Sequence, residues 1–327
     1  MCRLGLLLKV QFASQNRVPK LLQSEPKPHR SDDPGGVSVL VNVWGNDDAS
    51  ALTRSLASIL SQLRQPDEVI LVVDGPINKA LSTALQTFVD KANFPVKQLS
   101  LTSVTGLWNA RNEGIRAATY EFIALHDADD VMHPMRLSSQ VLEIDGSDID
   151  VLGSPVYEFD PVTERITGLR SMCNTSNFKK KIMWQNVINH SSVMFRKSVV
   201  LAIGGYHDVY LAEDYDLWLR MVRAGKNVCT TKFVLQAFSV DENLTKRRGG
   251  RKFLRSELQI HRIIKTNNSL NFLNLWIRLA LRIIYRITPS FVRQIHRNTF
   301  QTTNPKKAMS NLSNFLREPA PNVNLIR

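Results

Sequence analysis

The chain has 327 residues, of which 43% are hydrophobic and 22% are charged, a balance that excludes wholesale disorder and allows one large domain with extensions. Its three cysteines lie far apart and do not cluster with the seven histidines, which argues against a zinc site or a disulfide framework and fits a reducing compartment. The net charge of +13 is localised: residues 1–245 hold 25 Lys and Arg against 27 Asp and Glu, whereas residues 246–327 hold 17 against two. That C-terminal excess indicates a polyanionic partner or an anionic surface.

The N-terminal stretch is expected to lie outside the folded domain. Residues 4–12 are apolar but too short for a membrane anchor, and Lys9 interrupts them. Residues 13–36 are rich in Pro, Ser and charge, so we expect residues 1–36 to form a flexible lead-in.

From residue 37 onward, apolar runs that end at turn residues alternate with segments of helical periodicity. Strands are expected at 37–44, 67–76, 96–103 and 121–126, and helices at 50–63, 78–92 and 109–119. This alternation predicts an α/β fold with a Rossmann-like, mostly parallel sheet flanked by helices.

Polar side chains follow several of these strands. The sequence "GNDD" (45–48) follows the first, Asp74 ends the second, and "HDADD" (126–130) follows the fourth. Ligands gather beyond the carboxyl ends of parallel strands, so these residues are candidates for one site. The sequence has neither a GxGxxG fingerprint nor a P-loop.

The acids after the fourth strand suit a divalent cation. Asp127 and Asp129 are two residues apart, so in extended backbone both carboxylates point to the same side. Two hard oxygen ligands with open positions suit Mg²⁺ or Mn²⁺ that also holds phosphates. The alternative is a surface turn or a helix cap, because Asp130 stands three residues before His133.

Four blocks in this order carry a family resemblance: "VSVLVNVWGNDDASALTRSLASILSQ", "VILVVDGP", "LWNARNEGIRAATYEFIALHDADD" and "AEDYDLWLRM". Together they resemble glycosyltransferase family 2, which has the GT-A nucleotide-sugar-binding fold. "INHSSVMFRKSVVLAIGGYHDVYLAEDYDLWLRMV" and "TKRRGG" are similar to the bacterial branch for O-antigen, capsule and exopolysaccharide, of the amylovoran-biosynthesis type. The resemblance covers roughly residues 37–265, which we take as the GT-A domain.

The resemblance implies roles on the donor side. Asp129 would be the principal ligand of Mn²⁺ or Mg²⁺ with Asp127 beside it, and the metal would bridge the two phosphates. Asp74 would contact the uracil, and Arg111 would contact the base or the diphosphate unless it is an ordinary helix arginine. The remaining expected contacts are Asn42 and Val43 with the nucleoside, and Arg247 and Arg248 with the diphosphate from a mobile loop, unless these two belong to a solvated charge run.

On the acceptor side, the resemblance implies that Asp214 is the general base of an inverting single displacement, with Glu213 as an acceptor contact. Both acids could instead cap the helix that follows them. His190 is expected either to touch the acceptor or the phosphates or to be a satisfied polar residue at a strand edge.

The C-terminal extension, residues 266–327, combines apolar and basic residues. Arg278, Arg282 and Arg286 are four residues apart and would form one basic stripe on a helix. We expect this helix to lie on an anionic membrane surface, and the alternative is a helix that packs on the domain. The last 30 residues are expected to be mobile.

These features predict a metal-dependent inverting glycosyltransferase that moves a hexose, best guess galactose, from a UDP-sugar to a polyprenyl-diphosphate-linked saccharide. Other donors (glucose, GlcNAc or rhamnose) remain open. The expected location is cytoplasmic and peripheral, on the inner face of the bacterial cytoplasmic membrane. A different class, a polyanion-binding protein that uses the basic tail, predicts aromatic residues interleaved with a basic groove. The tail alternates Arg with aliphatic residues instead, so no nucleic-acid partner is expected.

Overall fold

The computed structural model describes residues 35–170, 175–240, 251–266, 270–289, 311–317 and 319–320. The expected lead-in therefore lies outside the described residues up to residue 34. The first strand begins at Val37, as the sequence predicts.

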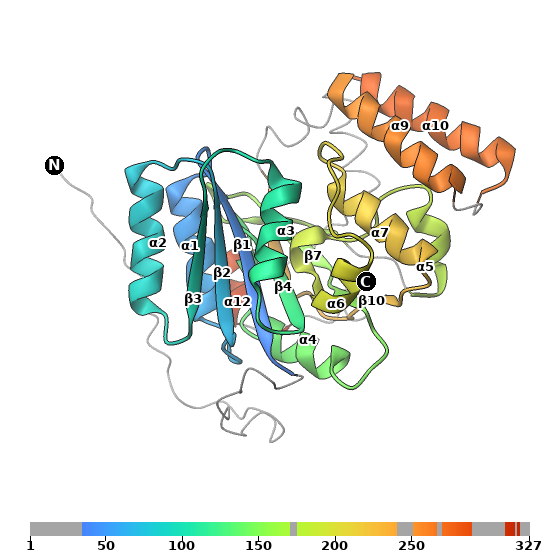
Figure 1. The fold of residues 1–327 in the computed structure, drawn as a ribbon. Coiled ribbons are helices and arrows are strands. Elements are labelled where there is room, and N and C mark those ends of the chain that lie inside the picture. The colour runs from blue at the N-terminus through green and yellow to red at the C-terminus, as the bar shows by residue number, and fades with distance from the viewer. Residues whose placement is uncertain are drawn as a thin grey trace.

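A seven-stranded sheet forms the centre of the molecule (Figure 1). Its strands run in the order β10-β6-β9-β4-β1-β2-β3, and only β9 is antiparallel to its neighbours. The strands are β1 (Val37–Trp44), β2 (Glu68–Asp74), β3 (Val96–Leu101), β4 (Phe122–Asp127), β6 (Val151–Gly153), β9 (Met194–Arg196) and β10 (Val228–Thr230). The mixed, mostly parallel sheet confirms the predicted fold class.

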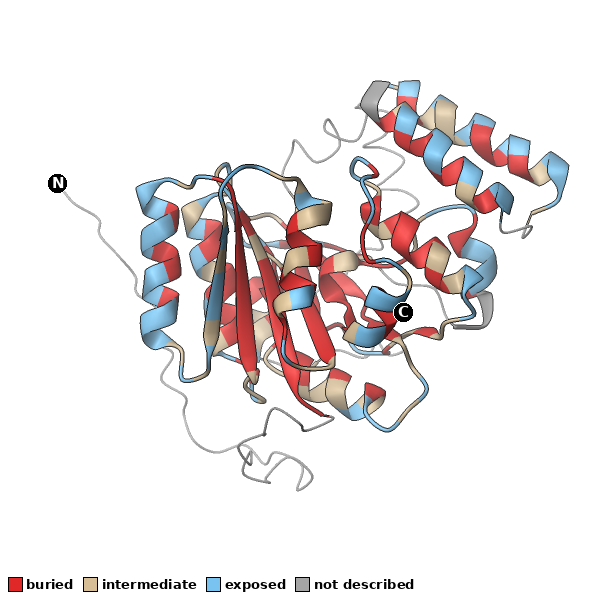
Figure 2. Ribbon diagram, in the orientation of Figure 1, coloured by how far each residue is buried: buried red, intermediate tan, exposed pale blue. Residues whose placement is uncertain are grey.

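Both faces of this sheet are covered by helices, so its central strands are buried on both sides (Figure 2). The side chains of Val39, Val41 and Leu71 pack on the face covered by α1 (Ala49–Leu60), α2 (Lys79–Lys91) and α4 (Arg136–Ile144). Leu40 and Val72 pack on the opposite face with α3 (Leu107–Ala117), α6 (Lys197–Ala202) and α7 (Glu213–Arg223). Strands β1 and β2 therefore each contribute side chains to two separate hydrophobic cores, one on each face of the sheet.

A smaller four-stranded sheet has the order β5-β11-β7-β8. It consists of β5 (Val131–Met132), β11 (Gln236–Ser239), β7 (Val156–Phe159) and β8 (Ile166–Arg170). Helix α12 (Leu312–Arg317) packs against it through Leu312 and Phe315, which are buried. The expectation that the last 30 residues are mobile is therefore wrong for this segment.

Helices α9 (Arg251–Thr266) and α10 (Phe272–Ile287) form an antiparallel hairpin beside α7, at the upper right of Figure 1. The sequence suggested a domain end at residue 265, and this hairpin contains residues on both sides of that boundary. The other helical segments are α5 (Thr175–Ile182) and a short 3-10 helix, η2 (His190–Ser192). Within the described ranges, no helix is long and apolar enough to span a membrane.

The basic stripe of α10 points inward, which corrects its expected orientation toward a membrane. Arg278 is 1% exposed, and Arg282 and Arg286 each donate hydrogen bonds to Glu257 of α9 at 2.8 Å. Glu257 is itself buried. Since the only acid in the sequence of these two helices lies opposite the stripe, the arginines hold α10 against α9 rather than facing solvent.

Candidate active site

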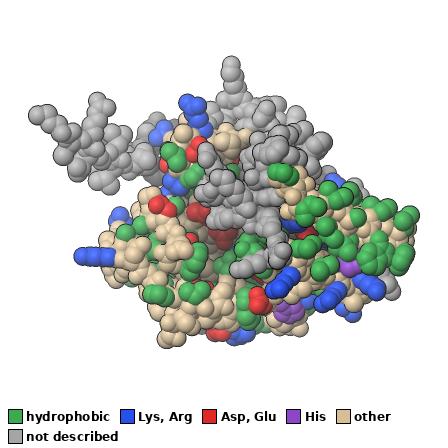
Figure 3. All heavy atoms as spheres, turned by 90° about the horizontal axis from the view of Figure 1, so that it is seen from above, with side chains coloured by type: hydrophobic (Ala, Val, Ile, Leu, Met, Phe, Trp, Pro, Cys, Tyr) green, Lys and Arg blue, Asp and Glu red, His purple; other side chains and the backbone are tan. Residues whose placement is uncertain are grey.

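Strand register brings the polar residues that follow β1, β2 and β4 to one edge of the sheet. Asn42 of β1 lies opposite Asp127 of β4, and Trp44 lies opposite Asp74 of β2. In the space-filling view from above, acidic side chains gather around a hollow near the centre of the molecule (Figure 3). The predicted convergence at the carboxyl ends of the strands is therefore present.

Asp74 holds the loop that leads into α3. One carboxylate oxygen accepts hydrogen bonds from the backbone N–H and the hydroxyl of Thr105 at 2.7 and 3.1 Å, and the other accepts the N–H of Gly106 at 3.1 Å. Gly106 has a φ of +92°, a conformation that favours glycine, and it begins α3. Asp74 thus has a structural role beside the expected contact with a base.

Arg111 of α3 is the centre of the charged network. It is 5% exposed, its Nη1 donates to Oε1 of Glu213 at 2.6 Å, and its Nη2 lies 3.9 Å from Oδ1 of Asp127. The guanidinium also lies 5.4 Å from the ring centroid of Tyr206. Burial alone would lower the pKa of Arg111, but Glu213 and Asp127 raise it, so this cation is permanent. Arg111 is therefore not an ordinary exposed helix arginine.

Asp214 lies in the first turn of α7 with properties that suit a base. Asn186 donates from Nδ2 to Asp214 Oδ2 at 2.7 Å, and the N–H of Tyr215 donates to Oδ1 at 2.7 Å. Burial and the neighbouring Glu213 raise the pKa of Asp214 to about 6, although Arg111 opposes this shift. A carboxylate with a pKa near the working pH is well matched to proton abstraction.

His190 lies within the same network. Its Nε2 is 2.9 Å from the hydroxyl of Tyr206, and its Nδ1 is buried without a hydrogen-bond partner. Burial and the charge of Arg111 hold the pKa of His190 well below its usual value, so the imidazole is neutral. The ring of His190 also packs edge-on against the ring of Tyr206 and lies 6.2 Å from the ring of Trp218.

The three acids after β4 have different environments. Asp130 is fully buried and accepts hydrogen bonds from the N–H of Ser239 at 2.9 Å and from Gln236 at 3.3 Å, so it joins the two sheets. The side chain of Asp127 is 36% exposed, and Asp129 is exposed. Burial and the charge of Glu213 raise the pKa of Asp127 despite the opposing effect of Arg111.

These two accessible acids fit a divalent cation that is shared with a ligand. Within the described residues, no group of three or more His, Cys, Asp or Glu side chains forms a complete metal cage. Asp127 and Asp129 would supply two oxygens, and Mg²⁺ commonly takes one or two carboxylates together with substrate phosphates. Burial and the charge of Glu213 raise the pKa of Asp127, and a bound cation would oppose both effects by stabilising the carboxylate.

Two expected nucleoside contacts differ in their placement. Asn42 is partly exposed beside Asp127, but its Oδ1 atom is buried and has no hydrogen-bond partner. Val43 is 1% exposed and packs in the core beneath α1, so only its backbone can face a nucleoside. Arg247 and Arg248 lie outside the described residues.

Two residues of the site were not predicted from the sequence, whereas a third, Asp47, belongs to the predicted "GNDD" group. Asn186 and Tyr206 complete the surroundings of Asp214 and Arg111, but they lie in loops without periodicity, so no local pattern marks them. Asp47 of the "GNDD" turn accepts the N–H of Trp44 at 2.7 Å. Burial raises its pKa, and the charge of Asp127 adds to the shift, which places Asp47 at the same edge.

The family model "Glycosyl transferase family 2" matches residues 38–203, which include the strands and acids that form this edge. The chain belongs to glycosyl transferase family 2. A second model, "Glycosyl transferase family group 2", matches residues 122–303 and so extends over Asp214 and the hairpin. The predicted family is confirmed, and with it the assignment of the chain as a glycosyltransferase.

Two curated relatives match along nearly their whole length. The amylovoran biosynthesis glycosyltransferase AmsE of Erwinia amylovora is 29% identical over 79% of this chain and 96% of its own. An Escherichia coli UDP-Gal:alpha-D-GlcNAc-diphosphoundecaprenol beta-1,3-galactosyltransferase is 28% identical over 80% of this chain and 95% of its own.

Solved structures support the fold. S. aureus TarS 1–349 in complex with UDP-GlcNAc has a TM-score of 0.57 at 19% identity, covering 80% of this chain and 75% of its own. The mannosyltransferase PcManGT from Pyrobaculum calidifontis, in complex with GDP-Man and Mn²⁺, has a TM-score of 0.50 at 16% identity over 79% of this chain and 78% of its own. These likenesses confirm the GT-A-like architecture.

Proposed function

We propose that this family 2 glycosyltransferase moves a hexose, galactose in the first instance, from a UDP-sugar to a lipid-linked saccharide in the synthesis of a surface polysaccharide. The observation that carries the proposal is the placement of Asp214, a base with a pKa of about 6, beside the acidic edge where β1, β2 and β4 end. The E. coli relative is named for a UDP-Gal donor and a diphosphoundecaprenol-linked acceptor, and AmsE is named for amylovoran biosynthesis, which supports the proposed donor, acceptor and pathway class.

In the proposed reaction Asp214 removes the proton from an acceptor hydroxyl. The acceptor oxygen forms a bond to the anomeric carbon while the bond from that carbon to the diphosphate oxygen breaks. The electron pair leaves with UDP, and a single displacement of this kind inverts the anomeric configuration. Asn186 and the N–H of Tyr215 hold the carboxylate of Asp214 by one hydrogen bond to each oxygen.

On the donor side, Asp74, Asn42 and the backbone of Val43 are proposed to bind the nucleoside. Arg111, fixed by Glu213, is proposed to face the diphosphate, and Arg247 and Arg248 remain proposed contacts from outside the described residues. Asp127 and Asp129 would hold Mn²⁺ or Mg²⁺, which neutralises the charge that develops on the leaving diphosphate when it is bound. The Mn²⁺ complex of PcManGT supports a metal in this fold.

We also propose that the protein docks on the inner face of the cytoplasmic membrane through the outer face of α10. Eight apolar residues are exposed along that face with no polar one among them: Phe272, Leu273, Trp276, Ile277, Ala280, Leu281, Ile284 and Ile287. They form the hydrophobic area at the right of Figure 3. Arg255, Arg262 and Lys265 of the neighbouring helix α9 are also exposed, and apolar and cationic residues exposed on one helical hairpin suit an anionic bilayer.

A panel of UDP-sugars tests the donor and the metal together. Purified protein should release UDP slowly from one sugar when Mn²⁺ is present, and EDTA should abolish the release. Asp129→Ala should lose it too, whereas Asp145→Ala, which removes an exposed acid at the end of α4, should retain it. Failure of every UDP-sugar to bind in calorimetry with Mn²⁺ present would overturn the proposed donor class.

A further inference from the structure

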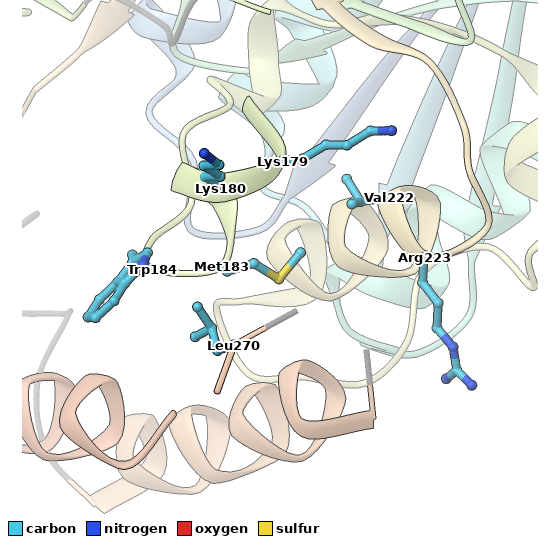
Figure 4. Close-up of a pocket in the computed structure, with 7 residues that line it drawn as sticks. All are labelled: Lys179, Lys180, Met183, Trp184, Val222, Arg223 and Leu270. Carbon is cyan, nitrogen blue, oxygen red and sulfur yellow. The ribbon is translucent and has the colours of Figure 1, made fainter. Parts of the chain in front are cut away.

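A cavity of about 560 Å³ lies between α5, α7 and the start of α10 (Figure 4). This volume is in the range of small-molecule sites, about 300–1,000 Å³. Its lining comes from three segments: α5 with the residues just after it, the last turn of α7, and Leu270 before α10. None of these residues belongs to the nucleotide edge of the sheet, so the proposed donor site does not account for the cavity.

The lining combines an apolar interior with a cationic rim. Met183, Trp184, Val222 and Leu270 are the apolar residues, and Figure 4 shows Met183 and Leu270 facing each other with Trp184 at one end. The remaining lining residues are Lys179, Lys180 and Arg223, all exposed. Among the described residues, no acidic one lines the cavity. A ligand that satisfies both parts must carry an apolar chain and a negative charge.

Residues next to the cavity lining contact the proposed base, Asp214, and its helix. Trp184 is two residues before Asn186, which donates to Asp214 at 2.7 Å. The hydroxyl of Tyr215 donates to the carbonyl of Ile182 at 2.6 Å, which fixes the end of α5 against α7. Val222 follows Asp214 by eight residues on α7, which is about 12 Å along a helix. The cavity wall and the proposed base therefore lie on the same two segments, α7 and the residues after α5.

The cavity lies close in sequence to the outer face of α10. Leu270 lines the cavity, and Phe272 and Leu273, only two and three residues further, are 77% and 67% exposed. Exposed Asn271 stands between Leu270 and this face, so an apolar chain that leaves the cavity at Leu270 would pass one polar residue before it meets the apolar face. If α10 rests on a bilayer, the chain would enter the membrane there.

We propose that this cavity binds the phosphate groups and the first lipid units of a lipid-linked saccharide acceptor. Lys179, Lys180 and Arg223 would contact the phosphates, and the apolar interior would hold the start of the lipid chain. The sugar would then extend toward Asp214. This inference rests on the proposed function, because it assigns the lipid-phosphate part of the acceptor for that same reaction.

Vesicle flotation tests the cavity without requiring transfer. The full chain is mixed with phosphatidylcholine vesicles that contain either undecaprenyl phosphate or phosphatidylglycerol at equal surface charge. The wild-type protein should bind the undecaprenyl phosphate vesicles more tightly. In the triple variant Lys179→Gln, Lys180→Gln, Arg223→Gln, the ratio of binding to undecaprenyl phosphate vesicles over phosphatidylglycerol vesicles should fall by about tenfold or more. The substitutions remove the charge-assisted hydrogen bonds to phosphate.

The matched control removes three exposed lysines elsewhere: Lys79→Gln, Lys91→Gln, Lys232→Gln. It makes the same change in net charge and should keep the preference. A triple cavity variant that also keeps it would overturn the proposal. Equal binding of both vesicle types by the wild-type protein would overturn it too, since the surface would then recognise anionic lipid in general.

A second arm separates this inference from the proposed chemistry. Asp214→Asn should abolish transfer but keep the preference for undecaprenyl phosphate vesicles, because Asp214 does not line the cavity. In transfer assays the triple cavity variant should show a raised KM for a lipid-linked acceptor. With the same saccharide on a short uncharged aglycone, its KM should match that of the wild-type protein. An equal rise in KM for both acceptors would contradict a phosphate site.

Discussion

Two charged clusters beside α7 have inverse compositions. At the start of the helix, Glu213, Asp214 and Asp127 surround one buried cation, Arg111. Beside the helix, Arg278, Arg282 and Arg286 surround one buried anion, Glu257. The first cluster has an excess of acid and includes half-exposed carboxylates, whereas the second has an excess of base and is largely enclosed.

The opposite compositions fit different roles: the acidic cluster belongs to the candidate active site, and the basic cluster holds α10 against α9. Burial and then repulsion from Glu213 raise the pKa of Asp127 and Asp214 at this half-exposed edge, although Arg111 opposes both shifts. The arginines of the second cluster point inward, toward Glu257. Burial alone would raise the pKa of Glu257, but the charges and hydrogen bonds of Arg282 and Arg286 outweigh burial and lower it. Tyr215 joins the two clusters, since it follows Asp214 and its hydroxyl lies 3.4 Å from Nη2 of Arg278.

The largest expected effect is on the acidic cluster. Asp214→Asn keeps the shape of the side chain but cannot accept the hydroxyl proton, so transfer should fall by about 10²–10⁴-fold. Binding of UDP, measured by calorimetry, should remain within about twofold because Asp214 is not a proposed donor contact. A variant that transfers sugar at close to the wild-type rate would exclude Asp214 as the base.

Substitution in the basic cluster should lower the free energy of unfolding. Glu257→Gln leaves three arginines without their buried anion, and removal of one partner from a buried charge pair costs about 3–5 kcal/mol. Urea unfolding followed by circular dichroism measures this loss. The control, Glu113→Gln, breaks an exposed pair with Arg116 and should cost less than about 1 kcal/mol. Equal stability of the two variants would mean that the hairpin does not depend on Glu257.

The outward face of α10 provides the next test, because the inward arginines leave only apolar side chains exposed. Ile277→Asp with Ile284→Asp should reduce flotation with anionic vesicles by about tenfold or more, since each large apolar side chain contributes about 1.5–3 kcal/mol on burial. Leu142 and Val162 are 79% and 89% exposed elsewhere, so Leu142→Asp with Val162→Asp is the matched control. Equal losses in both variants would argue against docking through α10.

A smaller effect is expected on the pH profile. The charge of Glu213 raises the pKa of Asp214, so Glu213→Gln should lower it. The acid limb of kcat against pH should therefore move to lower pH, by about one pH unit or less. If the limb moves upward instead, Glu213 must hold the proton that we assign to Asp214.

Much of the central sheet could be predicted from the sequence, because strands buried on both faces are continuous apolar runs and their helices have clear periodicity. The expected strands at 37–44 and 121–126 correspond to Val37–Trp44 and Phe122–Asp127. Convergence of Asp74 and Asp127 also followed from the sequence, since parallel strands end at the same edge. These inferences depend on local pattern and on one topological rule.

The remaining features depend on contacts between distant residues. The arginine stripe of α10 was visible in the sequence, but periodicity cannot show which face of a helix meets another helix. That face is set by Glu257, which lies 25 residues before its partner Arg282. Asn186 reaches Asp214 from a loop, and α12 returns to β8 across more than 140 residues through the bridge of Arg165 with Asn311. Such partners have no signature in a local window.

The most direct test of the central claim is the pH dependence of kcat for transfer by the wild-type protein. If Asp214 is the base, kcat should rise with pH through an apparent pKa of about 6 and then reach a plateau, because the carboxylate must be deprotonated to accept the hydroxyl proton. Asp214→Glu should retain an acid limb at reduced rate. A kcat that is flat from about pH 5 to 8 would contradict the assignment of Asp214 as a base tuned by burial and by Glu213.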